Sequence, residues 1–310
     1  MPNGKSTGRT KAKQATANAA TQSGILADVP RLSRYHWFDL APNADPRATL
    51  KALAKLADGS TLVVGIGQAL TQALDGEIRQ LRLFPRLSGP GFDIPSTPSA
   101  LWCWLRGDDQ GDLVHRSRAL LRSLAPTFLL SQTVDAFVYQ GGKDLTGYED
   151  GTENPTGQQA VAAAILADAG PGLDGSSFVA VQQWLHDLDT FDAMSPRAQD
   201  DTFGRRKSDN EEFASAPTSA HVKRTAQESF DPQAFILRRS MPWSKGQQAG
   251  LVFVAFGKSF DAYEALLSRM VGIEDGGSDA LFNFTRPLTG AYFWCPPMAE
   301  KQLDLRALKL

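Results

Sequence analysis

The chain has 310 residues, of which 42% are hydrophobic, and a formal net charge of −2. This composition allows a sizeable core in one large or two modest domains. The near-neutral charge favours neither nucleic acid nor an anionic membrane surface as a partner. No apolar stretch approaches the ~20 residues of a membrane-spanning helix. Two cysteines far apart, Cys103 and Cys295, make neither a disulfide framework nor a zinc site, so we expect reduced, buried thiols in a cytoplasmic protein.

The first 24 residues differ in composition from the rest of the chain. They contain lysine and arginine, no acidic residue and almost no large apolar side chain. Such a segment cannot bury enough surface to become ordered, and it lacks the apolar centre of a secretory signal. It is only weakly similar to a transit peptide. We therefore predict a disordered basic tail over residues 1–24, with ordered structure beginning near Ile25.

The first half of the ordered region predicts the element order β-α-β-β-α-β. A helix start is indicated by Asp45-Pro46, with aspartate as the N-cap and proline at the first helical position. The Pro- and Gly-rich stretch 83–98 is predicted to be a long loop. Strands are predicted over 35–40, 61–66, 101–105 and 133–139, and a second helix over about 113–124.

The second half predicts the same order. Helix is expected from about residue 189, and Ser195-Pro196 is a further helix start within that region. Strands are expected over 178–184, 235–240, 251–256 and 290–295, and apolar residues at helical spacing run from Phe260 to Met270. The repeated order predicts an α+β fold of two tandem ferredoxin-like modules, residues 25–145 and 146–310, each an antiparallel sheet covered by helices on one face.

The segment from Gly147 to Pro155 connects the two predicted modules. Its Gly, Asp, Asn and Pro residues favour irregular backbone, and Asp150-Gly151 alone would suit a hairpin turn. Yet Glu149, Asp150 and Glu153 place three carboxylates within five positions. A turn does not need them, whereas a site that uses an acid does.

Histidine is scarce, and the four histidines form no pair or cluster with metal-ligand spacing. His36, His115 and His186 are best interpreted as surface or satisfied core residues. His221 follows a polar loop and the punctuation Pro217-Thr218-Ser219, which is unusual for a structural histidine. A single histidine is enough to serve as an axial haem ligand.

Alternation along the predicted strand 235–240 places Arg238 and Ser240 on one face and Arg239 on the other. Two arginines on a strand are also typical of a solvated edge. Periodicity alone leaves open which face is buried.

Together, these segments resemble the dye-decolourising peroxidases, and among them the bacterial P-type (formerly B-type) group. The hallmark is Gly147-x-x-Asp150-Gly151 with its continuation to Pro155, and the resemblance spans roughly residues 25–297. His221 occupies the proximal ligand position and Arg238 the distal arginine position. Further matches lie at 204–209 and 287–293. The departures are Tyr148, where phenylalanine is common, Ser240, where related sequences carry asparagine or serine, and the basic tail.

The resemblance implies a haem b peroxidase that reduces hydrogen peroxide through a ferryl intermediate and oxidises small organic reductants such as phenols and dyes. Haem would be held mainly by the C-terminal module, with His221 as the axial iron ligand. Asp279 is either the carboxylate partner of His221 or an ordinary loop aspartate. Asp150 would transfer protons, and Arg238 would stabilise developing charge and lower the pKa of Asp150. Which of these two groups dominates stays open.

The remaining haem contacts are assigned more loosely. Phe253 is a candidate distal aromatic residue or, equally, a core phenylalanine. Arg205, Arg206 and Lys207 are candidates to bind the haem propionates, unless they form a solvated basic run. The residues assigned to cofactor binding are His221, Arg238, Ser240, Phe253, Gly151, Thr152, Glu153, Asn154, Arg205, Lys207 and Asp279.

Other functions are compatible with the same scaffold. A haem carrier or deferrochelatase is the main alternative, although storage requires neither Asp150 nor Arg238. A haem-free binding module and a chlorite-degrading enzyme are weaker alternatives. The expected partners are hydrogen peroxide, a small-molecule reductant and further copies of the chain. The short tail 299–310 is only faintly like a docking peptide, so targeting to an encapsulin shell is not expected.

Overall fold

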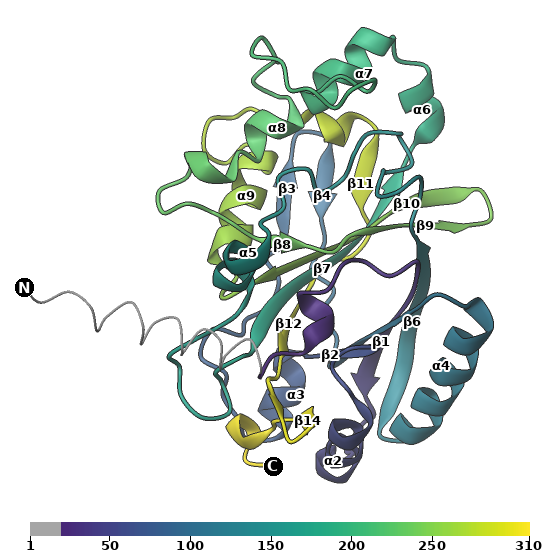
Figure 1. Ribbon diagram of the computed structural model, residues 1–310, viewed down its shortest axis with the longest axis vertical. Helices are drawn as coiled ribbons and strands as arrows, with labels where there is room; N and C mark the ends of the chain where they lie inside the picture. Colours follow the sequence, from purple (N-terminus) through teal and green to yellow (C-terminus); the bar gives the residue numbers. More distant parts are fainter. Residues whose placement is uncertain (1–19) are drawn as a thin grey trace, which may run out of the picture.

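The computed structural model describes residues 20–310, in which two four-stranded antiparallel sheets face each other (Figure 1). The first sheet has the order β2-β5-β1-β6, built from β1 (Leu32–Leu40), β2 (Leu62–Ile66), β5 (Leu101–Gly107) and β6 (Phe128–Phe137). The second has the order β12-β7-β10-β9, built from β7 (Ser177–His186), β9 (Met241–Lys245), β10 (Gln248–Gly257) and β12 (Ala291–Cys295).

Numbered within its own half, each sheet has the strand order second-third-first-fourth, which is the ferredoxin-like arrangement. The predicted fold class is therefore confirmed. The two sheets also meet at both edges, through single residue pairs between Ile66 and Trp294 and between Ala136 and Trp243. Two short strands, β8 (Leu237–Arg238) and β11 (Thr285–Pro287), extend the second sheet.

The outer faces of the sheets are covered by α2 (Arg47–Leu56), α3 (Gln68–Ala73), α4 (Gln110–Leu124) and α9 (Asp261–Val271). Helix α5 (Gly157–Ala164) packs against the inner aromatic cluster, and α6 (Leu188–Asp192), α7 (Pro196–Phe203) and α8 (His221–Arg224) lie towards the upper end of the molecule in Figure 1. The start of α7 is as predicted, because the Ser195 hydroxyl accepts a hydrogen bond from the amide of Ala198. Helix α2 starts one residue later than predicted, with Pro46 as its N-cap.

Two predicted elements differ in the structure. The stretch 83–98 is not only a loop, because it contains a hairpin, β3 (Leu87–Gly89) and β4 (Phe92–Ile94), turned at Gly91 with φ +83°. The strand predicted over 235–240 is reduced to the two residues of β8. The amide of Ile236 donates to Oε1 of Gln227 instead of to a neighbouring strand, so the preceding residues leave the sheet.

Two cores result from this arrangement. The space between the sheets is filled by aromatic side chains that stack on one another, among them Tyr35, Trp102, Trp104 and Phe293. A second core lies between the sheets and the outer helices. Cys103 and Cys295 are free and buried, as expected.

The predicted N-terminal tail needs a correction. Residues 1–19 lie outside the described residues, but residues 20–24 are part of the fold. The Gln22 side chain is fully buried: its Nε2 donates to the carbonyls of Val64 and Pro296, at 2.9 and 3.0 Å, and its Oε1 accepts from the amide of Val64 at 2.8 Å. The composition of the first 24 residues could not predict this, because it does not show that a single buried glutamine amide holds the segment in the fold.

No helix within residues 20–310 is both long and apolar enough to cross a membrane. The proposed domain boundary at residues 145 and 146 falls in the connection between β6 and α5, next to the functional site described below.

Candidate active site

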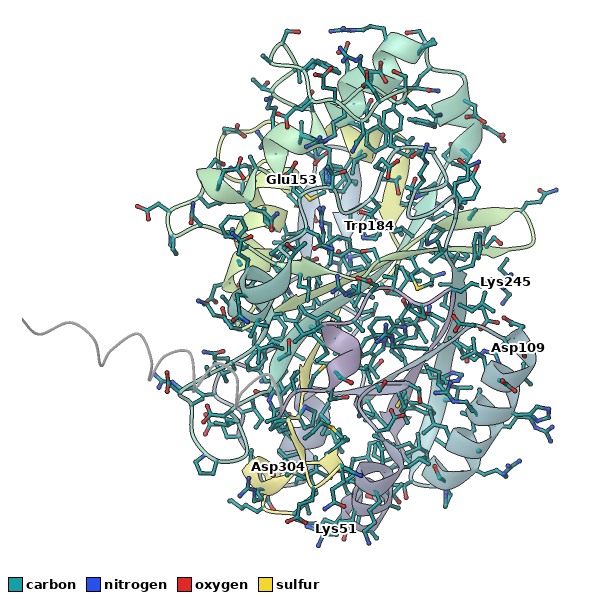
Figure 2. The ribbon with its side chains drawn as sticks, in the orientation of Figure 1. Lys51, Asp109, Glu153, Trp184, Lys245 and Asp304 are labelled. Carbon is teal, nitrogen blue, oxygen red and sulfur yellow. The ribbon has the colours of Figure 1, made fainter. Side chains whose placement is uncertain are left out.

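A cavity of about 340 Å³ lies among elements of the second half. Every residue that lines it falls between Asp144 and Thr285. The loop before α5 forms one wall, and α8, α9 and the ends of β7, β8 and β10 complete it. Figure 2 labels two lining residues, Glu153 and Trp184, on the side of the molecule away from Lys51 and Asp304.

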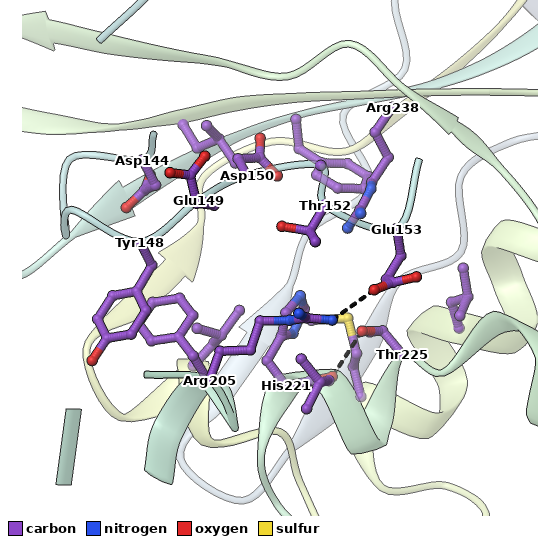
Figure 3. Close-up of a pocket in the computed structure, with 18 of the residues that line it drawn as sticks. Asp144, Tyr148, Glu149, Asp150, Thr152, Glu153, Arg205, His221, Thr225 and Arg238 are labelled. Carbon is purple, nitrogen blue, oxygen red and sulfur yellow. Dashed lines mark hydrogen bonds and ion pairs between the residues drawn. The ribbon is translucent and has the colours of Figure 1, made fainter. Parts of the chain in front are cut away.

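His221 is the first residue of α8 and lies on one wall of the cavity (Figure 3). Its Nδ1 is 2.7 Å from Oδ2 of Asp279, whose side chain is completely buried. The other oxygen, Oδ1, accepts from the amide of Leu281 at 2.9 Å, which fixes the carboxylate at the start of a 3-10 turn. An ionised carboxylate only accepts, so Nδ1 donates to it, and Nε2 makes no hydrogen bond within residues 20–310. Of the two interpretations of Asp279, the structure shows the one in which it contacts His221.

Asp150 and Arg238 lie across the cavity from His221 (Figure 3). The Nε of Arg238 is buried and has no hydrogen-bond partner among residues 20–310. Burial raises the pKa of Asp150; the positive charge of Arg238 opposes this shift and the negative charge of Asp144 adds to it. Arg238 lowers the pKa of Asp150 as predicted, but the cost of burying the carboxylate exceeds this attraction, so the net shift is upward.

Asn154 was predicted to contact the cofactor, but it does not line the cavity. Its Nδ2 donates to the carbonyl of Arg238 and its Oδ1 accepts from the amide of Arg238, both at 2.8 Å. The side-chain amide thus fastens the loop that carries Asp150 to the strand that carries Arg238. Ser240 is also outside the lining residues, because its hydroxyl accepts from the amide of Val254 at 3.3 Å. Arg239 points away, as predicted, with its guanidinium on the carbonyls of residues 25 and 26.

The side chains of the basic run 205–207 point in different directions. Arg205 lines the cavity, and its guanidinium is 2.7 Å from Oε1 of Glu153, another predicted site residue. Lys207 does not line the cavity, since its ammonium lies over the ring of Tyr148 at 5.5 Å. Arg206 faces away too and pairs with carboxylates of its own loop. The assignment of Lys207 to the cofactor stays a prediction, and adjacent side chains of this irregular loop point in different directions.

The remaining predicted residues meet at the cavity. Gly151 has φ +79°, a conformation that favours glycine, and the Thr152 hydroxyl accepts from Nδ2 of Asn210 at 2.9 Å. Phe253 lies on the floor, which is largely apolar. That floor is formed by Ile236, Leu251, Phe253, Tyr263, Leu266, Leu267, Met270 and Leu281.

Several lining residues were not predicted. Gln182, Trp184 and His186 come from β7, and Asp144 precedes the motif loop. Both ring nitrogens of His186 are hydrogen-bonded, so it is a satisfied residue as expected, but it also faces the cavity. No motif marks these positions. The one sequence feature that indicated the apolar floor of the cavity was the helical spacing of apolar residues in α9.

Comparisons with known proteins agree with this geometry. Residues 142–300 match the family model of the C-terminal part of Dyp-type peroxidases. A dye-decolourising peroxidase of Mycolicibacterium paratuberculosis is 30% identical over 70% of this chain, and the match spans 63% of that relative's length. A dye-decolourising peroxidase of Rhodococcus erythropolis is 30% identical over 77% of this chain and 73% of its own length.

Solved structures are similar over most of the chain. A Dyp-type peroxidase protein from Shewanella oneidensis is 27% identical, with a TM-score of 0.82 over 92% of this chain and 96% of its own. DyPB from Rhodococcus jostii is 28% identical, with a TM-score of 0.81 over 89% of this chain and 96% of its own. Variants of the latter were solved in complex with heme. The matched family model covers half of the chain, and it includes the whole cavity and both of its walls: the chain belongs to the Dyp-type (dye-decolourising) peroxidase family.

Proposed function

We propose that this protein is a haem b peroxidase that reduces hydrogen peroxide and oxidises a small organic reductant such as a phenol or a dye. The observation that carries the proposal is the position of His221, held by a buried carboxylate, on one wall of an apolar cavity, opposite a second carboxylate and an arginine. The family match and the relatives solved with heme support it. Self-association and a cytoplasmic location stay predictions.

The residues of the cavity fit a haem group. The floor is apolar, as the flat macrocycle requires, and His221 offers a nitrogen donor with no other partner among residues 20–310. On the opposite wall, the buried Nε of Arg238 has no acceptor among the described residues, so a bound group could supply one. Haem, when bound, would supply the iron at which peroxide is reduced and the oxidising equivalents are stored.

On the proximal wall, His221 would hold the iron through Nε2. The short hydrogen bond from Nδ1 to the buried Asp279 fixes the tautomer and the orientation of the ring. It also makes the imidazole a stronger electron donor, because negative charge lies next to its proton. This favours the higher oxidation states that a peroxidase must reach.

On the distal wall, Asp150 would accept a proton from one peroxide oxygen and return it to the other, so that water leaves. A carboxylate whose pKa is raised towards the working pH is suited to both steps, and a positioned acid–base group contributes ~10²–10⁴-fold. Arg238 keeps its proton and would stabilise the negative charge that develops as the oxygen–oxygen bond breaks. Phe253 on the floor would exclude water.

At the cavity mouth, Arg205 is the candidate for the haem propionates, together with the backbone of Gly151, Thr152 and Glu153. The guanidinium of Arg205 now contacts Glu153 and Glu212, at 2.7 and 3.3 Å. A propionate would compete with these carboxylates or join them around the same cation.

The test is the absorption spectrum of the purified full chain, before and after one equivalent of hydrogen peroxide, for the wild type and His221→Ala. A strong Soret band that the substitution removes or shifts, and that changes rapidly with peroxide in the wild type, is the expected result. A Soret band that does not respond to peroxide would instead indicate a haem carrier or deferrochelatase. A chain that takes up no haem on reconstitution would refute the proposal.

A further inference from the structure

A glutamine of β7, Gln182, lies on the same face of the second sheet as Arg238. Residues that pair across antiparallel strands place their side chains on one face, and so do alternate residues along a strand. Arg238 pairs with Ala255 of β10, and Gln182 pairs with Phe253, two residues before Ala255. Arg238, Phe253 and Gln182 therefore project from one face, and all three line the cavity. The roles proposed above do not use Gln182.

The orientation of the Gln182 amide is determined by its two partners. Oε1 of Gln182 accepts from Nε1 of Trp184 at 3.3 Å and from the hydroxyl of Tyr263 at 2.6 Å. An indole N–H can only donate, so the atom that faces Trp184 must be the amide oxygen and not the nitrogen. Trp184 and Tyr263 line the cavity as well. The amide is thus held at its oxygen, and its nitrogen remains for another partner.

The nitrogen of this amide has no such partner in the described part of the chain. Gln182 is 1% exposed, and its Nε2 makes no hydrogen bond within residues 20–310. A buried polar group without a partner is costly and rare in native proteins. Among the buried side-chain atoms of residues 20–310 that share this property, only Nε2 of Gln182 and Nε of Arg238 belong to residues that line the cavity. This face of the sheet thus presents two donors, and both need an acceptor from the group or molecule that fills the cavity.

The acceptor for Gln182 must be a small oxygen-containing molecule. The propionates of haem are charged and would lie at the mouth of the cavity, beside Arg205 and the exposed Glu153. Moving an ionised carboxylate to a glutamine that is 1% exposed would cost far more than one neutral hydrogen bond returns. The other substituents of haem b are hydrocarbon and accept no hydrogen bond. Peroxide, and the water whose place it takes, are the acceptors that remain.

We propose that Gln182 is a further ligand-binding residue of the distal wall, whose Nε2 donates to an oxygen atom of hydrogen peroxide. This inference rests on the proposed function. A carboxamide neither gains nor loses a proton, so Gln182 contributes to the binding of peroxide and not to proton transfer. Trp184 and Tyr263 act through Gln182: they are positioning residues that keep the amide nitrogen directed away from themselves.

The donor is tested with fluoride, a small acceptor that binds ferric haem iron and does not react further. Its dissociation constant is measured from the absorption spectrum of the haem-loaded full chain, for the wild type and Gln182→Met, which keeps the length of the side chain without the amide. We expect the constant to rise about fivefold, which corresponds to one neutral hydrogen bond of ~1 kcal/mol. The second-order rate constant for the reaction with peroxide should fall by a similar factor. Both ratios should be the same at pH 5 and pH 8, because the amide does not titrate.

Gln183→Met is the matched control. Gln183 is the next residue of β7 and is also buried, but it accepts from Gln132 at 2.6 Å and does not line the cavity. Its substitution should leave both constants unchanged. Tyr263→Phe removes the shorter contact to Oε1 and keeps the amide, so it should weaken fluoride binding by less than Gln182→Met. If Gln182→Met takes up no haem, Gln182→Asn replaces it, because the shorter side chain withdraws the donor by one methylene and should also raise the constant.

The two proposals fail differently. A fluoride constant that is unchanged in Gln182→Met, or that rises equally in Gln183→Met, would overturn the role of Gln182 and leave the peroxidase standing. A loss of haem affinity in Gln182→Met with unchanged fluoride binding would also overturn it, because the amide would then serve the haem group itself. A wild-type protein without a Soret band, or with one that peroxide does not change, refutes the peroxidase.

Discussion

Replacing Asn154 with alanine should loosen the contact between the two distal residues. The substitution removes both 2.8 Å hydrogen bonds to the backbone of Arg238. The half-buried amide of Arg238 loses its acceptor, whereas its carbonyl keeps the hydrogen bond from the guanidinium of Arg239 at 3.1 Å. Each bond is worth ~0.5–1.5 kcal/mol, and an unpaired buried group costs more, so the expected loss is about 2–3 kcal/mol. At ~2.1 cal/mol/K per residue, the unfolding entropy of 310 residues makes 1 kcal/mol equal to about 1.5 °C. The Tm should fall by about 3–5 °C.

The assay is thermal unfolding of the full chain, followed by circular dichroism. Asn154→Asp keeps the acceptor for the amide of Arg238 and loses the donor, so it should lie between the wild type and Asn154→Ala. Asn283→Ala, at an exposed asparagine, should change the Tm by less than about 1 °C. In the haem-loaded protein, Asn154→Ala should also slow the reaction with peroxide while haem absorbance is kept. An unchanged Tm together with an unchanged peroxide rate would refute this account of Asn154.

Three further substitutions test other contacts. Asp150→Asn should raise the Tm at pH 7. Burial raises the pKa of Asp150, so the fold loses stability as the pH rises from the unfolded-state pKa of ~3.9 through the folded-state pKa. In thermal scans at several pH values the gain in Tm should vanish near pH 3, and a gain independent of pH would contradict this explanation. Gln22→Ala should lower the free energy of unfolding in urea by about 2–4 kcal/mol, since it leaves buried backbone groups unpaired, whereas an unstructured segment would show no change. Asp279→Asn should raise the reduction potential of bound haem iron, because His221 loses an ionised partner; an identical potential in a redox titration would exclude that role.

Much of the fold could be predicted because its signals are local. The Ser195-Pro196 pair starts α7, and the stripe from Phe260 to Met270 became a helix with its apolar face on the cavity and the core. The joining of the two sheets could not be predicted. It depends on single pairs such as Ile66 with Trp294, which are far apart in sequence and carry no pattern.

The sequence predicted those residues of the candidate site that belong to a recognisable motif, but not the others. Asp150, His221 and Arg238 lie around one cavity, as the resemblance implied. Lys207 does not line the cavity although Arg205 does, because position in an irregular loop does not determine where a side chain points. His186 was interpreted as structural because its partner Asp144 is 42 residues away in sequence.

The attachment of Arg239 has a practical consequence for protein engineering. Its guanidinium donates to the carbonyls of Ile25 and Leu26, at 3.2 and 2.7 Å, and to the carbonyl of Arg238 at 3.1 Å. Affinity tags and truncations at the N-terminus are usually treated as neutral. Here, a protease cut or a truncation that removes Gln22 to Leu26 would change the support of the residue next to Arg238. We therefore expect changes at residues 22–26 to alter the position of Arg238 without changing any residue of the cavity.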